Sequence, residues 1–143
     1  MKEPKEYLLK DLYIGQTESF KVSITEKMQE LFLELSNDTN PMHVDDSFAR
    51  MGGFKERLVY GMLTASYFST LVGVYLPGKY CLFHECDVQW PRPVYIGDTL
   101  TVTGKIEDIS ETLNMITIKA TVKNQNNEKV ARAKLMAEVK AHE

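Results

Sequence analysis

The sequence predicts a single α+β domain in which an antiparallel sheet wraps around one buried helix. The segment Tyr60–Gly73 is apolar on nearly every side, which is typical of a helix enclosed by the rest of the fold. From Tyr80 onward, apolar and polar residues alternate in segments separated by turns, the pattern of strands. These turns are too short for parallel crossovers, so the sheet should be antiparallel. The length of 143 residues suits one domain spanning 1–143.

A strand and an amphipathic helix are predicted before the buried helix. Alternation over Thr17–Ile24 indicates the strand. In the helix that follows, apolar residues recur at i, i+3, i+4 and i+7 and should face the core; they are Met28, Leu31, Phe32 and Leu35. Either Ser23 or Thr25 could cap this helix, and Ser23 with Glu26 forms a capping-box pattern.

The remaining elements follow from turn and cap signals. Asp45 or Asp46 could cap a short helical turn that ends at Gly52-Gly53. The buried helix should stop at Leu76-Pro77-Gly78. The segment Asn124–Asn127 is a turn between two strands of a hairpin. The predicted strands are Cys81–Trp90, Thr99–Ile109, Leu113–Val122 and Val130–Val139.

Charge and hydropathy exclude several classes of partner. The net charge is −3 and lysines and arginines are dispersed along the sequence, so we expect no nucleic-acid partner. The N-terminal residues lack the apolar core of a signal peptide. The most apolar stretch, Tyr60–Leu76, is too short and too polar to span a membrane. We therefore expect a cytoplasmic protein that makes no membrane contact.

The two cysteines do not indicate a disulfide or a metal site. Cys81 and Cys86 are separated by an odd number of positions, which places them on opposite faces of a regular strand. His84 lies between them, but one histidine and two cysteines without a Cys-x-x-Cys pair do not match zinc spacing. No Gly-rich dinucleotide fingerprint or P-loop is present. We therefore expect neither a metal nor a cofactor.

The most informative stretch of the chain is Leu35–Asp45. It places Asp38 and His43 five positions apart, with Asn40-Pro41 between them. Proline biases the preceding residue away from helical geometry, so both side chains should lie on a bent loop. A carboxylate and an imidazole converging on one water can add or remove water across a double bond. Taken singly, Asp38 could be a turn residue and His43 a half-buried histidine bonded to a backbone carbonyl.

The chain resembles the MaoC-like, (R)-specific enoyl-CoA hydratases. The resemblance rests on four segments in the family's order and spacing: Ser36–Asp45, Val59–Leu63, Leu76–Gly78 and Pro93–Thr99. Two positions depart from the family pattern. Tyr60 stands where many members have His, and Asn37 stands where Gly is frequent. Neither departure removes the acid/base pair.

The resemblance implies a hot-dog fold and a role in fatty acid metabolism. The implied reaction is syn hydration of a trans-2-enoyl thioester, carried by CoA or acyl carrier protein, to the (R)-3-hydroxyacyl product, or the reverse dehydration. Asp38 would be mainly the base, while His43 would orient the water and deliver a proton. The Gly61 N–H would meet charge on the thioester oxygen. The resemblance implies no cofactor, and it implies a homodimer or higher homo-oligomer.

Three further residues complete the set of candidate site residues. Asn40 should hold the loop through side-chain-to-backbone bonds. Ser69 occupies a position where the family commonly has a serine facing the site; the alternative is a hydroxyl bonded to its own helix. Tyr60 should affect how the pocket holds the thioester. Met62 and Asp98 are expected to serve the core and a turn, respectively.

Three other functions fit parts of the sequence. A hot-dog thioesterase would place a carboxylate on the long helix, but Tyr60–Leu76 contains no Asp or Glu. A non-catalytic module that binds acyl thioesters is the alternative from a different class. It remains an alternative because Tyr60 stands where many family members have His. A specialised dehydratase acting on an unusual acyl group would use the same chemistry.

Overall fold

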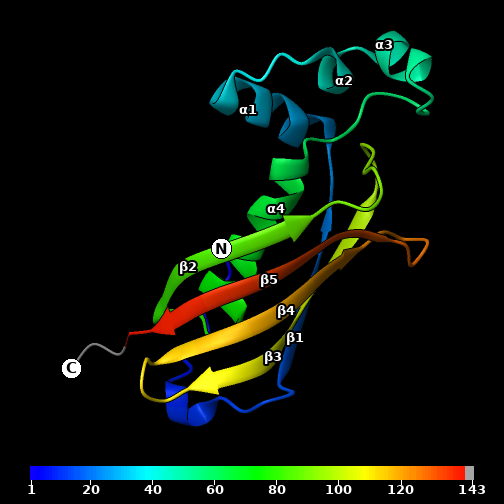
Figure 1. Cartoon of the computed structure of the whole chain (residues 1–143). Coiled ribbons are helices and arrows are strands. Elements are labelled where there is room, and N and C mark those ends of the chain that lie inside the picture. Colours follow the sequence, from blue (N-terminus) through cyan, green and yellow to red (C-terminus); the bar gives the residue numbers. More distant parts are fainter. Residues whose placement is uncertain (141–143) are drawn as a thin grey trace.

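The computed structural model describes residues 1–140, in which one antiparallel sheet packs against one long helix (Figure 1). The last three residues of the predicted domain 1–143 lie outside the described residues. The strands are β1 (Thr17–Ser23), β2 (Cys81–Gln89), β3 (Thr99–Ser110), β4 (Met115–Lys123) and β5 (Lys129–Val139). They lie in the order β1-β3-β4-β5-β2, and all neighbouring pairs are antiparallel. β1 and β2 therefore form the edges of the sheet.

The central helix is α4 (Gly61–Thr70), which continues as the π-helical turn η2 (Leu71–Tyr75) and lies across one face of the sheet (Figure 1). Beyond one end of the sheet lie α1 (Glu26–Ser36), α2 (Pro41–Val44) and α3 (Asp46–Met51). The short 3-10 helix η1 (Leu9–Asp11) precedes β1. Within residues 1–140, no helix combines the length and the apolarity that crossing a membrane requires.

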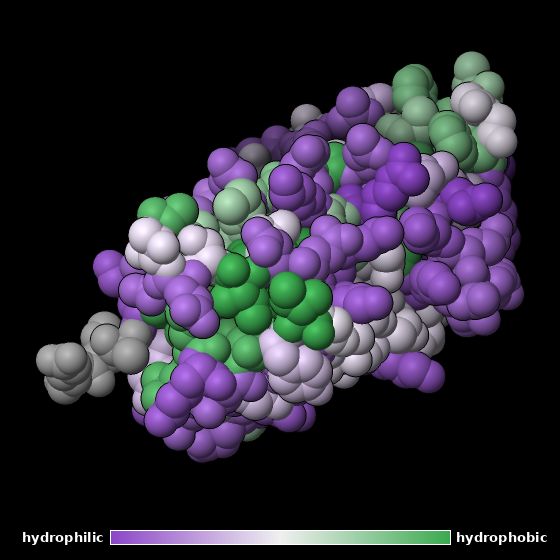
Figure 2. All heavy atoms as spheres, turned by 60° about the horizontal axis from the view of Figure 1, so that its bottom comes forward, coloured by the Kyte–Doolittle hydropathy of each residue, from purple (hydrophilic) through white to green (hydrophobic). Residues whose placement is uncertain are grey.

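The core lies between α4–η2 and the inner face of the sheet. Phe68 and Leu71 are fully buried against apolar side chains of β3, β4 and β5. A Cβ atom at Gly104 would lie 2.8 Å from Leu71 Cδ2, so glycine at this position of β3 lets the helix approach the sheet closely. The prediction of a buried central helix is confirmed except along one side, where Met62, Ser66 and Ser69 are exposed; Met62, expected in the core, is 62% exposed. In the view of Figure 2, a group of hydrophobic residues lies below and to the left of the centre and another lies at the upper right, on a mostly hydrophilic surface.

α1 differs from its prediction in its cap and in its buried face. The cap is Thr25, whose Oγ1 accepts a hydrogen bond from the Met28 N–H at 3.2 Å, whereas Ser23 belongs to β1. The predicted apolar stripe is wrong in half of its members, because Leu31 and Leu35 are exposed. The residue that α1 buries most deeply is Gln29, which is 4% exposed.

A β-bulge in β2 overturns the prediction that the two cysteines face opposite sides of the sheet. Cys81 pairs with Val139 and Cys86 pairs with Leu135, but the register shifts between Phe83 and Glu85. Val139 and Leu135 lie four positions apart on β5 and share its inner face, and directly paired residues point to the same side of a sheet. Cys81 and Cys86 therefore both face α4, and both are free thiols.

Candidate active site

The loop that carries Asp38 is held by a chain of side-chain-to-backbone bonds. α1 ends where Asn37 adopts a left-handed conformation with φ 56°. The Asp38 N–H donates to Ser36 Oγ at 3.2 Å, and Asp38 Oδ1 accepts from the Asn40 N–H at 3.2 Å. Asn40 Oδ1 in turn accepts from the Met42 N–H at 2.9 Å and caps α2. Asn40 thus makes the loop-holding bond that the sequence predicted.

His43 lies in the short helix α2, so the prediction that it sits on a bent loop together with Asp38 is wrong. Asn40 and Pro41 start this helix instead of only bending the chain. The ring Nδ1 lies 2.8 Å from the Leu58 carbonyl oxygen. Because a carbonyl can only accept, Nδ1 carries the proton of the neutral ring and Nε2 keeps its lone pair. Nε2 is therefore the nitrogen that can act on a substrate or a water.

Tyr60 connects the two predicted catalytic residues. Its hydroxyl donates to the backbone carbonyl of Asp38 at 2.5 Å, and its ring stacks on that of His43 with centroids 4.2 Å apart. Burial, together with the negative charge of Asp38, raises the pKa of the Tyr60 phenol above its ordinary value, so the hydroxyl stays protonated and donates. At the position where the family often has histidine, this chain thus has a residue that positions both segments.

Gln29 is a site residue that the sequence reasoning missed. Its Nε2 donates to the backbone carbonyls of His43 at 3.1 Å and Leu58 at 3.0 Å, and its Oε1 accepts from the Tyr60 N–H at 3.4 Å. One side chain from α1 thereby ties α2 to the start of α4. Helical periodicity assigned Gln29 to the polar face of α1, and no sequence signal distinguishes it from its exposed polar neighbours.

Two cavities meet at His43, Gly61 and Trp90, which line both. The first encloses about 420 Å³ and includes Asp38 and Tyr60 in its wall. The second encloses about 350 Å³. Its remaining lining is mostly apolar and consists of Phe54, Leu58, Val59, Thr64, Pro91, Arg92, Pro93 and Val94. Asp38 and His43 thus share a cavity that continues into an apolar space.

Gly61 begins α4 at the junction of these cavities. Tyr60, the residue before it, provides no side-chain cap, and the first N–H groups of a helix have no acceptor within the helix. The indole N–H of Trp90 donates to the Gly61 carbonyl at 2.9 Å. A Cβ at position 61 would lie 3.1 Å from Trp90 Nε1, so glycine lets the indole cover the helix terminus. Gly61 lines both cavities, so the uncapped start of α4 lies at their junction.

Ser69 lies apart from these residues. It is exposed on α4 and lines none of the cavities that contain His43. Ser66, one turn closer to Gly61, lines a third cavity of about 640 Å³ together with Phe32, Met62 and Trp90. Thr64 lines the apolar cavity, and its buried hydroxyl has no hydrogen-bond partner among residues 1–140. Asp98 is confirmed as a turn residue, since its Oδ2 accepts from the Tyr95 N–H at 3.0 Å.

Comparison with known proteins identifies the family. The sequence model of the family described as "MaoC like domain" matches residues 13–130 of this chain. The chain belongs to the MaoC-like family. This MaoC-like chain is 34% identical, over 115 residues and 80% of each protein, to an (R)-specific enoyl-CoA hydratase from Rhodospirillum rubrum. It is 35% identical over 92 residues to a mitochondrial 3-hydroxyacyl-[acyl-carrier-protein] dehydratase from Arabidopsis thaliana, covering 64% of this chain and 54% of that protein.

The solved structures confirm the hot-dog fold. An R-hydratase from Pseudomonas aeruginosa in its unliganded form superposes with a TM-score of 0.89 at 27% identity, covering 97% of this chain and 89% of that one. The named relatives are hydratases and dehydratases, which add or remove water. The central helix wrapped by an antiparallel sheet, predicted from the sequence, is the architecture that these proteins share with the MaoC-like chain.

Proposed function

We propose that this protein catalyses (R)-specific hydration of trans-2-enoyl thioesters to (R)-3-hydroxyacyl thioesters, or the reverse dehydration. The observation that carries the proposal is that Asp38 and His43 line one cavity beside the free N–H groups at the start of α4. Hydratases and dehydratases among the relatives support the same reaction.

Asp38 and His43 activate one water in this proposal. Asp38 Oδ1 is engaged by the Asn40 N–H, which leaves Oδ2 to take a proton from the water as its oxygen bonds to C3. The His43 ring donates from Nδ1 to Leu58, so Nε2 faces the water. The double-bond electrons move toward the thioester oxygen. Asp38 passes the proton taken from the water to the lone pair of His43 Nε2, and Nε2–H delivers it to C2 on the same face. General acid–base assistance of this kind contributes roughly 10²–10⁴ in rate.

The start of α4 stabilises the charge that this step creates. Negative charge develops on the thioester oxygen as C3 is attacked. The Gly61 N–H has no acceptor within the helix, and the helix dipole places partial positive charge at the same end. Tyr60 and Gln29 do not touch the reacting atoms in this scheme. They act as positioning residues that fix Asp38, His43 and the start of α4 relative to one another.

We also propose a homodimer that acts on CoA or carrier-protein thioesters. β2 is an edge strand with an unpaired hydrogen-bonding side, and such edges pair readily with a second chain. Beside it, α4 exposes Met62, Ser66 and Ser69, one side of an otherwise buried helix. Ser69 would meet the acyl group only along this open side. The free thiols of the two cysteines favour a reducing compartment, the cytoplasm.

The proposal is tested by the loss of enone absorbance from crotonyl-CoA. Asp38→Asn and His43→Gln should each lower kcat/KM by at least about 100-fold while keeping the melting temperature of the wild type. Glu34→Gln, which removes an exposed α1 carboxylate outside the cavities, is the matched control and should keep full activity. Chiral chromatography of the product should show the (R) isomer. A wild-type protein inert on crotonyl-CoA and longer enoyl thioesters would refute the proposed reaction.

A further inference from the structure

Seven cations that are dispersed in the sequence gather on the outer face of the sheet, opposite α4. We name this surface the basic face; it consists of Lys21, Lys105, Lys119, Lys123, Lys129, Arg132 and Lys134. The sequence showed no basic stripe, because alternate residues of separate strands supply the charges. Of the acidic residues on the same sheet face, Glu85, Asp108 and Glu138 lie toward the hairpin between β3 and β4, whereas Asp87 on edge strand β2 pairs directly with Lys134.

Three of these lysines repel one another within the sheet. Lys105 pairs directly with Lys119, and Lys119 pairs directly with Lys134. Like charges in directly opposed positions destabilise a sheet. Among residues 1–140, none of the three lysines forms an ion pair. Asp87 faces Lys134 from β2, but Lys119 has a like charge on both sides. An anion bound across the three lysines would relieve this repulsion.

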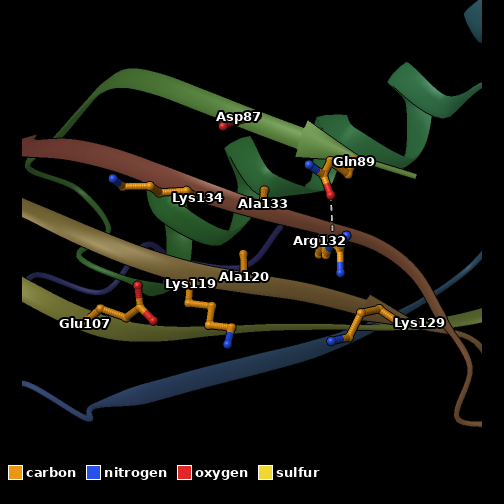
Figure 3. Close-up of a pocket in the computed structure, with 9 residues that line it drawn as sticks. All are labelled: Asp87, Gln89, Glu107, Lys119, Ala120, Lys129, Arg132, Ala133 and Lys134. Atoms are coloured by element: carbon orange, nitrogen blue, oxygen red, sulfur yellow. Dashed lines mark hydrogen bonds between the residues drawn. The ribbon is translucent and has the colours of Figure 1, made fainter. Parts of the chain in front are cut away.

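A hollow of about 350 Å³ lies in the middle of the basic face (Figure 3). Its cations are Lys119, Lys129, Arg132 and Lys134, and its carboxylates are Asp87 and Glu107 at two of its margins. Arg132 Nε donates to Gln89 Oε1 at 2.8 Å, which fixes one side of the guanidinium. Among residues 1–140, no aromatic side chain lines the hollow, so these residues offer no ring on which a nucleobase can stack.

The basic face adjoins the candidate active site through Arg92. Arg92 lines the apolar cavity together with His43. Its Nη1 donates to the Lys129 carbonyl at 3.3 Å, and Lys129 lines the hollow on the outer face. A partner seated on the basic face therefore lies beside the strand ends that border the catalytic cavity.

We propose that the basic face docks the acidic surface of an acyl carrier protein that presents the thioester to the site. This inference rests on the proposed function and selects one of its two carriers. The cations extend over β1, β3, β4 and β5, an area suited to a protein surface. The absence of a stacking ring in the hollow argues against the nucleotide part of CoA as its occupant. In a chain of net charge −3, this concentration of cations gives a carrier one complementary surface.

Lys119→Glu is the decisive variant, because it places a negative charge between the positive charges of Lys105 and Lys134. The sheet should become more stable, whereas an acidic partner should lose its central contact. Lys10→Glu, an equal charge change on exposed η1, is the matched control. The measurement is the ratio of kcat/KM for crotonyl carrier protein to kcat/KM for crotonyl-CoA. We expect this ratio to fall about tenfold in Lys119→Glu and to stay at the wild-type value in Lys10→Glu.

The ratio separates docking from chemistry. A ratio that stays constant in Lys119→Glu, or that falls equally in Lys10→Glu, overturns the docking proposal. If kcat/KM falls only for crotonyl-CoA, the ratio rises. That result assigns the basic face to CoA and also overturns the docking proposal. If the wild type hydrates neither substrate, the proposed function fails. Calorimetric titration with the crotonyl carrier protein then decides docking alone: weaker binding to Lys119→Glu supports it, and equal binding refutes it.

Discussion

Replacing Gln29 with leucine should loosen the whole candidate site from a residue that touches no reacting atom. The amide of Gln29 serves two backbone carbonyls and one backbone N–H, those of His43, Leu58 and Tyr60. Leucine has a similar volume but neither donates nor accepts. Gln29→Leu therefore leaves the His43 carbonyl and the Tyr60 N–H without a partner beside a side chain that is only 4% exposed. The Leu58 carbonyl keeps the hydrogen bond from His43 Nδ1.

The expected loss of stability follows from these two groups. Each buried polar group left unsatisfied costs about 1–3 kcal/mol, and the added apolar burial of leucine offsets part of this. We expect a net loss of about 3 kcal/mol in the free energy of unfolding. For a domain of this length that corresponds to a fall of roughly 10 °C in melting temperature. Because His43 and Tyr60 lose a common anchor, kcat/KM should also fall, by about tenfold or more.

Gln16 provides the matched control for this change. It is also buried, at 7% exposure, but its side chain accepts a single hydrogen bond, from the Tyr13 N–H at 3.1 Å. Gln16→Leu should therefore cost about 1 kcal/mol and leave turnover of crotonyl-CoA at the wild-type level. Thermal unfolding followed by circular dichroism gives both stabilities. Equal losses in the two variants would refute the reasoning that Gln29 ties α1, α2 and α4 together.

Three smaller changes test other features of the site. Gly61→Ala should lower kcat/KM about tenfold with little change in melting temperature, because the new methyl displaces Trp90; unchanged kinetics would show that the indole does not matter. Thr64→Val should raise the free energy of unfolding by about 1 kcal/mol, measured in urea, since it removes an unpartnered hydroxyl; a loss of stability would reveal a bond. Burial raises the pKa of Cys81 to about 11. Iodoacetamide at pH 8 should therefore label Cys86 before Cys81 by mass spectrometry, and labelling of Cys81 should accelerate as pH rises toward 11.

The strands could be predicted from the sequence because a period of two directly reports which side chains are buried. The bulge in β2 escaped prediction, since an extra residue near His84 has no signature in alternation. The orientation of α1 was not predicted correctly, for a different reason. Three hydrogen bonds compensate for the burial of Gln29, whereas Leu31 and Leu35 remain exposed. Periodicity counts apolar residues and does not register such polar compensation.

The positions of site residues could be predicted where a sequence motif determines them. They could not be predicted where the orientation of a helix determines them. The spacing of Asp38 and His43 indicated that they share a cavity, and they do. The bond from Tyr60 to the Asp38 carbonyl joins residues far apart in the sequence, so no local pattern predicts it. α4 is apolar all round, so its sequence does not indicate which serine faces a cavity. Ser66 lines one, whereas the predicted Ser69 lines none of those that contain His43.

The row of three lysines sets selection for thermal stability against selection for partner recognition. Screening variants for heat resistance alone should repeatedly replace Lys119, the middle member, which faces like charges on both sides. Such variants would be easier to purify and store and would look improved in every assay that uses a small soluble substrate. Their deficit would emerge only in competition with other enzymes for a limited pool of carrier. Engineering of this scaffold should therefore include the macromolecular substrate in its screen from the first round.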